Sequence, residues 1–159
     1  MQASRVLVPV CGMEADEDAL ALACDMIRPA KGKVYVLYVI EVLRSLPLDA
    51  DVEAENAKGE DVLQRMETLG KEFHVDLEAE ILRARDAGPA VVQEAVDRGV
   101  QAIVIGEPYR WHHGVFSLGN TAPYILRNAP CPVLLWRQGM STNGKPKKKG
   151  DEEGVSKGL

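Results

Sequence analysis

Residues Ala102–Trp136 decide the fold, and they read AIVIGEPYRWHHGVFSLGNTAPYILRNAPCPVLLW. The stretch begins with an apolar run that ends at Gly106 and continues as a polar, aromatic-rich loop to Gly119. A short helical pattern and a second apolar run, which follows Pro132, complete it. A buried strand, a glycine-edged loop and a helix start, in that order, predict a geometry that can bind a phosphate.

Strand and helix patterns alternate along the rest of the chain as well. Apolar, β-branched runs predict strands at Arg5–Val10, Lys33–Ile40, Asp76–Arg83, Val100–Ile105 and Val133–Trp136. Helical spacing predicts helices at Asp16–Ile27, Asp61–Phe73, Pro89–Val96 and Asn120–Arg127. Most of the strands are continuously apolar, which is typical of a parallel sheet covered on both faces. We therefore expect a Rossmann-like, doubly wound α/β fold with a five-stranded parallel sheet in the order 3-2-1-4-5.

Length and composition limit the classes of function. A chain of 159 residues is one ordinary domain, and its net charge of -5 argues against nucleic acid as a partner. No segment is long and apolar enough for a bilayer, and the first residues lack a signal-peptide pattern, so we expect a soluble cytoplasmic protein without a membrane partner. Composition predicts a folded domain at 1–137 and a disordered polar tail at 138–159. The three cysteines have irregular spacing, which favours free, largely buried thiols.

Ligands of a doubly wound sheet bind at the carboxyl ends of the strands. In this chain those ends are Pro9-Val10-Cys11, Val39-Ile40 and Ile105-Gly106. Gly119 precedes a predicted helix N-terminus, which favours an anion, and Asn120 or Thr121 can cap that helix. These residues predict a nucleotide pocket, although glycines at a strand end and a helix start are also routine turn chemistry.

The chain also resembles the universal stress protein family over about residues 4–137. Gly106 and Gly119 stand at the first and third glycine positions of that family's strand–loop–helix signature, at its spacing. The segment 124–134, YILRNAPCPVL, is very similar to the usual ending of the signature, and 7–10 and 37–40 resemble the family's first two strands. The resemblance implies a regulatory stress-response protein without enzymatic activity, with ATP or AMP as its candidate cofactor.

Three residues depart from the family's pattern. Tyr109 stands at the middle glycine of the signature, Asn120 at its serine or threonine, and Cys11 at the aspartate that nucleotide-binding members carry. A thiol replaces a carboxylate acceptor at the last position, while Arg110 can contact a phosphate. The nucleotide-binding residues that we predict are Pro9, Val10, Cys11, Val39, Ile105, Gly106, Tyr109, Arg110, Gly119, Asn120 and Thr121.

The last predicted strand is apolar and lies at a sheet edge in the expected order. An apolar edge favours pairing with another chain, and in the family this strand commonly builds a two-fold dimer. We therefore predict a homodimer through Val133, Leu134, Leu135 and Trp136.

Three functions follow from these patterns. The first is a dimeric regulatory protein with a modified adenine-nucleotide pocket. The second keeps the fold, binds no nucleotide and acts through an unknown protein partner, and the third is a nucleotide-hydrolysing enzyme. Glu41 and Glu107 follow strand ends but read as solvated loop acids, and Trp111-His112-His113 alone predicts no metal site.

Overall fold

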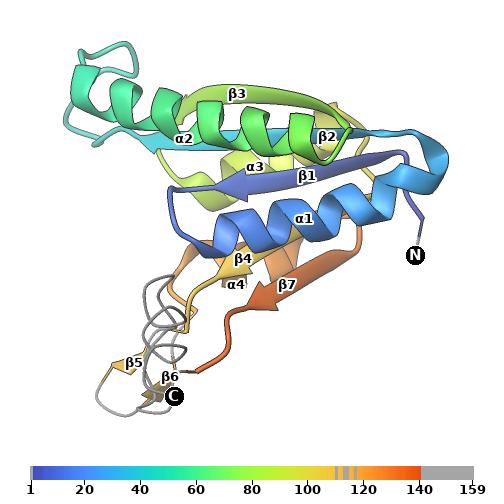
Figure 1. Ribbon diagram of the computed structural model, residues 1–159. Helices are drawn as coiled ribbons and strands as arrows, with labels where there is room; N and C mark the ends of the chain where they lie inside the picture. Colours follow the sequence, from blue (N-terminus) through green and yellow to red (C-terminus); the bar gives the residue numbers. More distant parts are fainter. Residues whose placement is uncertain (1, 110, 113–114, 117, 141–159) are drawn as a thin grey trace, which may run out of the picture.

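Five parallel strands form the central sheet in a computed structural model that describes residues 2–109, 111–112, 115–116 and 118–140 (Figure 1). The strands are β1 (Arg5–Val10), β2 (Lys33–Glu41), β3 (Asp76–Ala84), β4 (Ala102–Glu107) and β7 (Val133–Arg137). Their order is β3-β2-β1-β4-β7. Since β7 is the fifth strand of this sheet along the chain, the predicted order 3-2-1-4-5 is confirmed, and β3 and β7 form its two edges.

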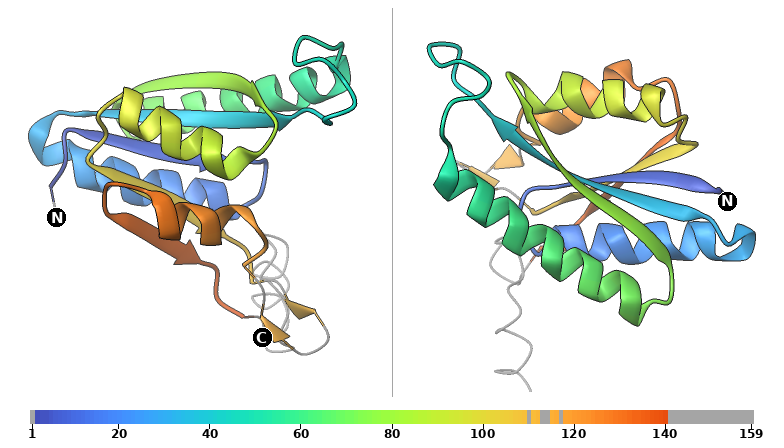
Figure 2. Two further views of the ribbon diagram at one scale, coloured as in Figure 1. Left: turned by 180° about the vertical axis from the view of Figure 1, so that it is seen from behind. Right: turned by 90° about the horizontal axis from the view of Figure 1, so that it is seen from above.

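Helices cover both faces of the sheet, as the apolar strands predicted (Figure 2). Helix α1 (Ala15–Ile27), followed by the short 3-10 turn η1 (Arg28–Ala30), packs with α2 (Glu53–Glu72) on one face. Helices α3 (Ala87–Asp97) and α4 (Thr121–Asn128) pack on the other face. Side chains of β1, β2 and β4 therefore enter both apolar cores, which explains their nearly continuous apolar runs.

Helix α2 begins eight residues earlier than predicted, because the prediction treated the polar segment around Gly59 as a loop. A β carbon at Gly59 would lie 2.8 Å from Cδ1 of Tyr38, so this glycine lets α2 approach β2 closely. Close packing outweighs the low helix propensity of glycine here. Strand β4 begins at Ala102 and ends at Glu107, two residues later at each end than predicted.

A two-stranded hairpin, β5 (Trp111–His112) and β6 (Val115–Phe116), lies between β4 and α4 and was not predicted. Beyond β7, the backbone N–H of Gln138 donates to the carbonyl of Glu107 at 2.8 Å, and Gln138 is buried. Contacts with the domain thus continue past the predicted boundary at residue 137, and 141–159 of the predicted tail lie outside the described residues. In the part that the structure describes, no helix has the length and apolarity required to cross a membrane.

Strands β1 and β4 separate at their carboxyl ends. Their ladder contains only the pairs Val6–Ala102 and Leu7–Ile103, whereas β1 stays paired with β2 as far as Val10. The ladder with β4 ends two residues before Pro9, which has no N–H to donate. This split lies where the strand order reverses, the usual position of a ligand site in such a sheet.

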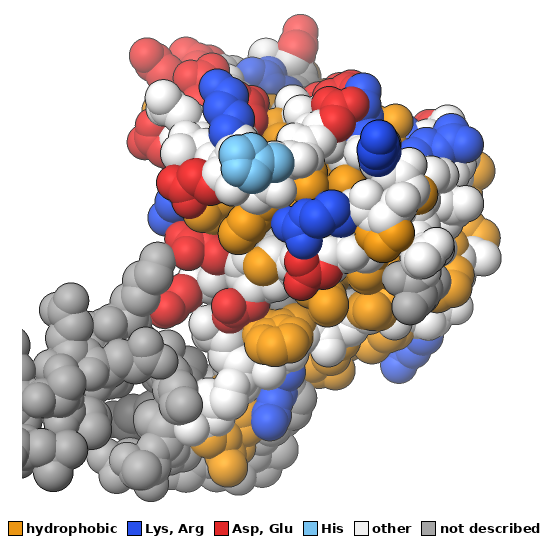
Figure 3. All heavy atoms as spheres, turned by 45° about the vertical axis from the view of Figure 1, so that its right-hand side comes forward, with side chains coloured by type: hydrophobic (Ala, Val, Ile, Leu, Met, Phe, Trp, Pro, Cys, Tyr) orange, Lys and Arg blue, Asp and Glu red, His pale blue; other side chains and the backbone are white. Residues whose placement is uncertain are grey.

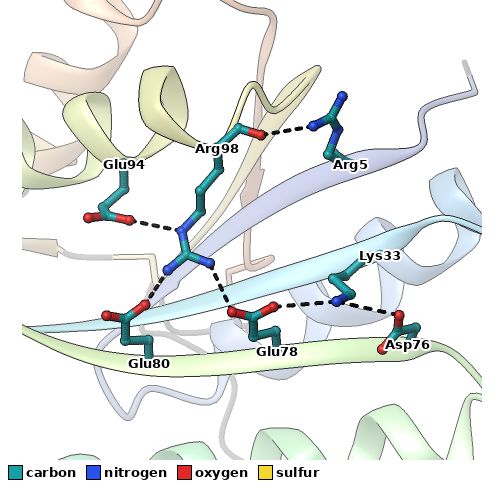
Figure 4. Close-up of polar contacts among 7 residues, drawn as sticks. All are labelled: Arg5, Lys33, Asp76, Glu78, Glu80, Glu94 and Arg98. Carbon is teal, nitrogen blue, oxygen red and sulfur yellow. Dashed lines mark hydrogen bonds and ion pairs between the residues drawn. The ribbon is translucent and has the colours of Figure 1, made fainter.

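An arginine network fixes α3 to the edge strand β3 (Figure 4). Arg98 follows the last residue of α3, and its guanidinium donates to Glu94 at 2.8 Å, to Glu78 at 3.5 Å and to Glu80. The same guanidinium lies 4.8 Å from the centre of the Tyr35 ring. The network therefore joins one helix and two strands on the face that α3 covers.

Candidate functional site

The loop between β1 and α1 is organised by a buried carboxylate. Oδ2 of Asp16 accepts backbone N–H bonds from Cys11 at 3.1 Å, Gly12 at 2.8 Å and Met13 at 2.9 Å. Asp16 is 1% exposed, and this burial raises its pKa, although the three N–H bonds act in the opposite direction. Asp16 therefore fixes the shape of the loop between β1 and α1.

A cavity lies at the carboxyl ends of the strands, where β1 and β4 separate. Its volume is about 170 Å³, which is smaller than the about 300–1,000 Å³ that is common for small-molecule sites. We call it the strand-end cavity. Its walls are Pro9, Val10, Cys11, Met13, Asp16, Leu37, Val39, Glu41, Ala87, Val91, Ile105, Gly106, Glu107, Thr121 and Ile125.

A second cavity adjoins the first, because Glu41, Ala87 and Thr121 line both. We call it the helix-end cavity, since the first residues of α3 and α4 form much of its wall. The N-terminal N–H groups of helices favour negative charge. Its walls are Glu41, Asp86, Ala87, Gly88, Pro89, Gly119, Asn120, Thr121 and Tyr124.

At two positions of these walls, a glycine is needed because neighbouring atoms pack closely against it. A β carbon at Gly106 would overlap the backbone carbonyl of Ala15, and one at Gly88 would lie 2.9 Å from the Tyr124 side chain. Gly119 has a different reason, because its φ of 70° lies in the left-handed region. Gly106 therefore has a structural explanation that requires no ligand.

The two acids that follow strand ends lie at the cavities and differ in exposure. The prediction that Glu107 is a solvated loop acid is wrong, because Glu107 is only 5% exposed. Glu107 is the last residue of β4 and belongs to the ladder that β4 forms with β7. Glu41 is exposed, and its Oε1 accepts the backbone N–H of Ala87, the first residue of α3, at 3.3 Å. Glu41 therefore acts as the anion at that helix N-terminus.

The cysteines are thiols, but the prediction that they are largely buried is wrong for Cys11, which is exposed and lines the strand-end cavity. Cys131 is half-buried, and burial raises its pKa. Cys24 lies in the core, where burial raises its pKa to about 11. Among the described residues, no group of three or more His, Cys, Asp and Glu side chains is placed to hold a metal ion.

Most of the predicted site residues gather at the two cavities. Pro9, Val10, Cys11, Val39, Ile105, Gly106 and Thr121 line the strand-end cavity, while Gly119, Asn120 and again Thr121 line the helix-end cavity. Sequence reasoning missed Leu37 of β2. It also missed Asp16, Ala87, Val91 and Ile125, because a single sequence does not show which helix side chains face a strand end.

Two predicted residues lie elsewhere, and one predicted cap is absent. Tyr109 is outside the described walls of both cavities, and its ring lies 4.9 Å from the Arg137 guanidinium. Arg110 lies outside the described residues. Asn120 occupies the cap position of α4, but its side chain makes no capping hydrogen bond there.

Comparison with known proteins identifies the family. Residues 3–137 match the family model described as the universal stress protein family. A curated relative, the universal stress protein MJ0531 of Methanocaldococcus jannaschii, is 25% identical over 150 residues, which cover 91% of this chain and 84% of the relative.

Solved structures show the same fold. A universal stress protein family protein from Arabidopsis thaliana with AMP bound has a TM-score of 0.66 at 19% identity, over 91% of this chain and 99% of that one. The Archaeoglobus fulgidus universal stress protein in complex with dAMP has a TM-score of 0.67 at 19% identity, over 85% of this chain and 98% of that one. From its sequence match over residues 3–137, the chain belongs to the universal stress protein family.

Proposed function

We propose that this protein is a regulatory binding protein of the stress response that takes an adenine nucleoside or nucleotide into the strand-end cavity. The observation that carries the proposal is the cavity at the split between β1 and β4, at the switch point of the sheet. The similar folds from Arabidopsis thaliana and Archaeoglobus fulgidus hold AMP and dAMP, respectively, which supports an adenine ligand.

The chemistry of the walls suits a flat, donor-bearing ring. Leu37, Val39 and Ile105 offer apolar surface, which binds the faces of an aromatic base. The carboxylates of Asp16 and Glu107 lie in the same wall and are acceptors for an exocyclic amine. In this proposal the pocket is a modified one, because Cys11 replaces a carboxylate and Tyr109 lies outside the walls.

A phosphate of the ligand would lie at the start of α4, beside Gly119, Asn120 and Thr121, which line the adjoining cavity. The protein would act by binding, not by catalysis, and the thiol state of its cysteines favours a cytoplasmic location. We further propose that β7 forms a homodimer, because it is a sheet edge that carries the exposed side chain of Trp136.

The space-filling view supports an interface at β7. Figure 3 shows hydrophobic side chains gathered over the lower part of the face, whereas acidic and basic side chains dominate its upper part. Trp136 is 46% exposed and Met140 is 53% exposed, while Leu134 packs partly into the core under α1. An exposed tryptophan on a strand that forms a sheet edge is typical of an interface with a second copy.

One observation favours the second candidate, a protein that acts through protein contacts without a nucleotide. The loop between β2 and α2 exposes Leu43, Leu46 and Leu48. Arg85 holds that loop by donating to the carbonyls of Leu43 at 2.6 Å and Leu46 at 2.7 Å. A fixed loop with exposed leucines suits a protein partner.

The exposed thiol in the cavity wall provides the test of the ligand proposal. We expect adenosine or AMP to slow the alkylation of Cys11, because a ligand in the strand-end cavity would cover it. Cys131 is the internal control, since it precedes β7 and so lies at the amino end of the sheet, away from the cavity. Cys24 should stay unreactive at neutral pH, because its pKa is about 11.

A cavity-filling variant sharpens the test. In Val39→Phe the added ring should remove the protection of Cys11, while Val96→Phe, at a position 53% exposed on α3, should retain it. Mass spectrometry of labelled peptides reads each thiol separately, and calorimetry with the same ligands measures Kd. Equal labelling of Cys11 with and without ligand, together with no heat of binding, would favour the protein-partner function.

A further inference from the structure

We propose that Glu41 makes the site selective for an adenine nucleoside or its monophosphate and rejects polyphosphates, an inference that rests on the proposed function. Glu41 ends β2 at the boundary between the strand-end and helix-end cavities and lines both of them. If the base of a nucleotide lies in the strand-end cavity and its phosphates extend into the helix-end cavity, the phosphates therefore pass Glu41.

Glu41 already occupies the place that a phosphate would take at α3. Its carboxylate accepts the N–H of Ala87 at 3.3 Å, so the positive end of that helix dipole is neutralised by the protein's own anion. The start of α4 is different, because the side chain of its cap residue, Asn120, makes no capping hydrogen bond there. One phosphate can therefore bind at Gly119–Thr121. A second or third phosphate would lie against the acidic side of the helix-end cavity.

The charge of the cavity walls also disfavours a polyphosphate. Asp16, Glu41, Asp86 and Glu107 line the two cavities, and no Lys or Arg lies among the described residues of their walls. Arg44 is paired with Asp86 at 3.0 Å, so Arg44 adds little attraction and Asp86 adds little repulsion. Each additional phosphate brings more negative charge toward carboxylates, and at about 4 Å such repulsion is worth on the order of tenfold in affinity even when solvent screens it.

Calorimetry on the full chain tests the inference with adenosine, AMP, ADP and ATP, each in EDTA so that no magnesium neutralises the phosphates. We expect Kd for ATP to exceed Kd for AMP by about tenfold or more. Glu41→Gln keeps an oxygen that can accept the Ala87 N–H but removes the charge. In that variant ATP should bind about tenfold more tightly, whereas adenosine should change by less than about twofold.

Glu60→Gln is the matched control, because it removes the same charge from an exposed position of α2 outside both cavities. It should leave all four Kd values unchanged. Raising the salt to about 1 M should reduce the ratio of the ATP and AMP values in the wild type, since screening weakens charge repulsion.

The outcomes distinguish the role of Glu41 from the proposed nucleotide binding on which it rests. Binding of ATP as tight as that of AMP, or an unchanged ATP-to-AMP ratio in Glu41→Gln, would overturn the role of Glu41 while leaving nucleotide binding in place. No binding of any of the four ligands to the wild type would instead overturn the proposed function, and the inference with it.

Discussion

A β carbon at Gly106 would overlap the backbone carbonyl of Ala15, so this glycine lets β4 lie directly against the start of α1. The same residue lines the strand-end cavity, and the sequence alone suggested that its missing side chain serves a ligand. Because Ala15 fills that space, a glycine is required here with or without a ligand.

We predict that Gly106→Ala destabilises the fold by about 2–3 kcal/mol, because the overlapped atoms belong to backbone and must move. The free energy of unfolding in urea measures this change. Gly139→Ala is the control, since a β carbon there meets nothing within 4 Å, and it should change stability by less than about 0.5 kcal/mol. Equal stability of the two variants would show that the helix and strand can separate at little cost.

Asp16 gives a second prediction, because its Oδ2 accepts three backbone N–H bonds. Asp16→Ala leaves these donors without their acceptor and should cost about 2–3 kcal/mol of unfolding free energy. Asp16→Asn keeps an oxygen acceptor and should stay within about 1 kcal/mol of the wild type near neutral pH. If both substitutions had the same effect, the hydrogen bonds would not be the source of the stability.

The pH dependence of the Asp16 contribution follows from its raised pKa, which burial causes. The folded state holds the proton of this carboxyl more tightly than the unfolded state, whose pKa is about 3.9. The stability of the wild type relative to Asp16→Asn should therefore be greatest below that value and fall as the pH rises through the raised folded pKa. Urea titrations of both proteins from about pH 4 to about pH 7 measure the difference.

The layout of the sheet could be predicted from sequence because each strand has a clear physical signature. The runs at β1, β2 and β4 are apolar on both faces, as buried parallel strands require, whereas β3 alternates and proves to be an edge. The first turns of α2 could not be predicted, since their polar residues and Gly59 look like a loop until Tyr38 is brought against them.

The site was predictable only where backbone position decides it. Strand ends such as Pro9–Cys11 and Ile105–Gly106 meet at one edge of any parallel sheet, and they line the cavity. The burial of Glu107 depends on how far β4 pairs with β7, and the contact of Glu41 with Ala87 joins residues that are 46 positions apart. Neither relationship leaves a pattern in the local sequence.

Arg98 offers a third prediction, because its side chain is 17% exposed and binds Glu78, Glu80 and Glu94. Arg98→Met keeps an apolar side chain of similar length but leaves these carboxylates without their shared cation, so we expect a loss of about 1–2 kcal/mol. Lys33→Met is the control, since its pairs with Asp76 and Glu78 are more exposed and should contribute less than about 1 kcal/mol.

Salt distinguishes the charge effect in Arg98→Met from lost packing. The three carboxylates repel one another in this variant, and the repulsion is screened at high ionic strength. The deficit relative to the wild type should therefore shrink when urea denaturation is repeated in about 1 M salt. A deficit that does not change with salt would assign the loss to the contact between the guanidinium and the Tyr35 ring.

The proposed dimer gives the last prediction, because β7 is a sheet edge and Trp136 is 46% exposed. Trp136→Glu places a charge where two copies of the strand would meet, so we expect light scattering to give the mass of a dimer for the wild type and of a monomer for the variant. Leu43→Glu is the control, since Leu43 is 70% exposed in the loop after β2 and should leave the dimer intact. A wild-type monomer at micromolar concentration would contradict the interface, and dissociation of both variants would place it elsewhere.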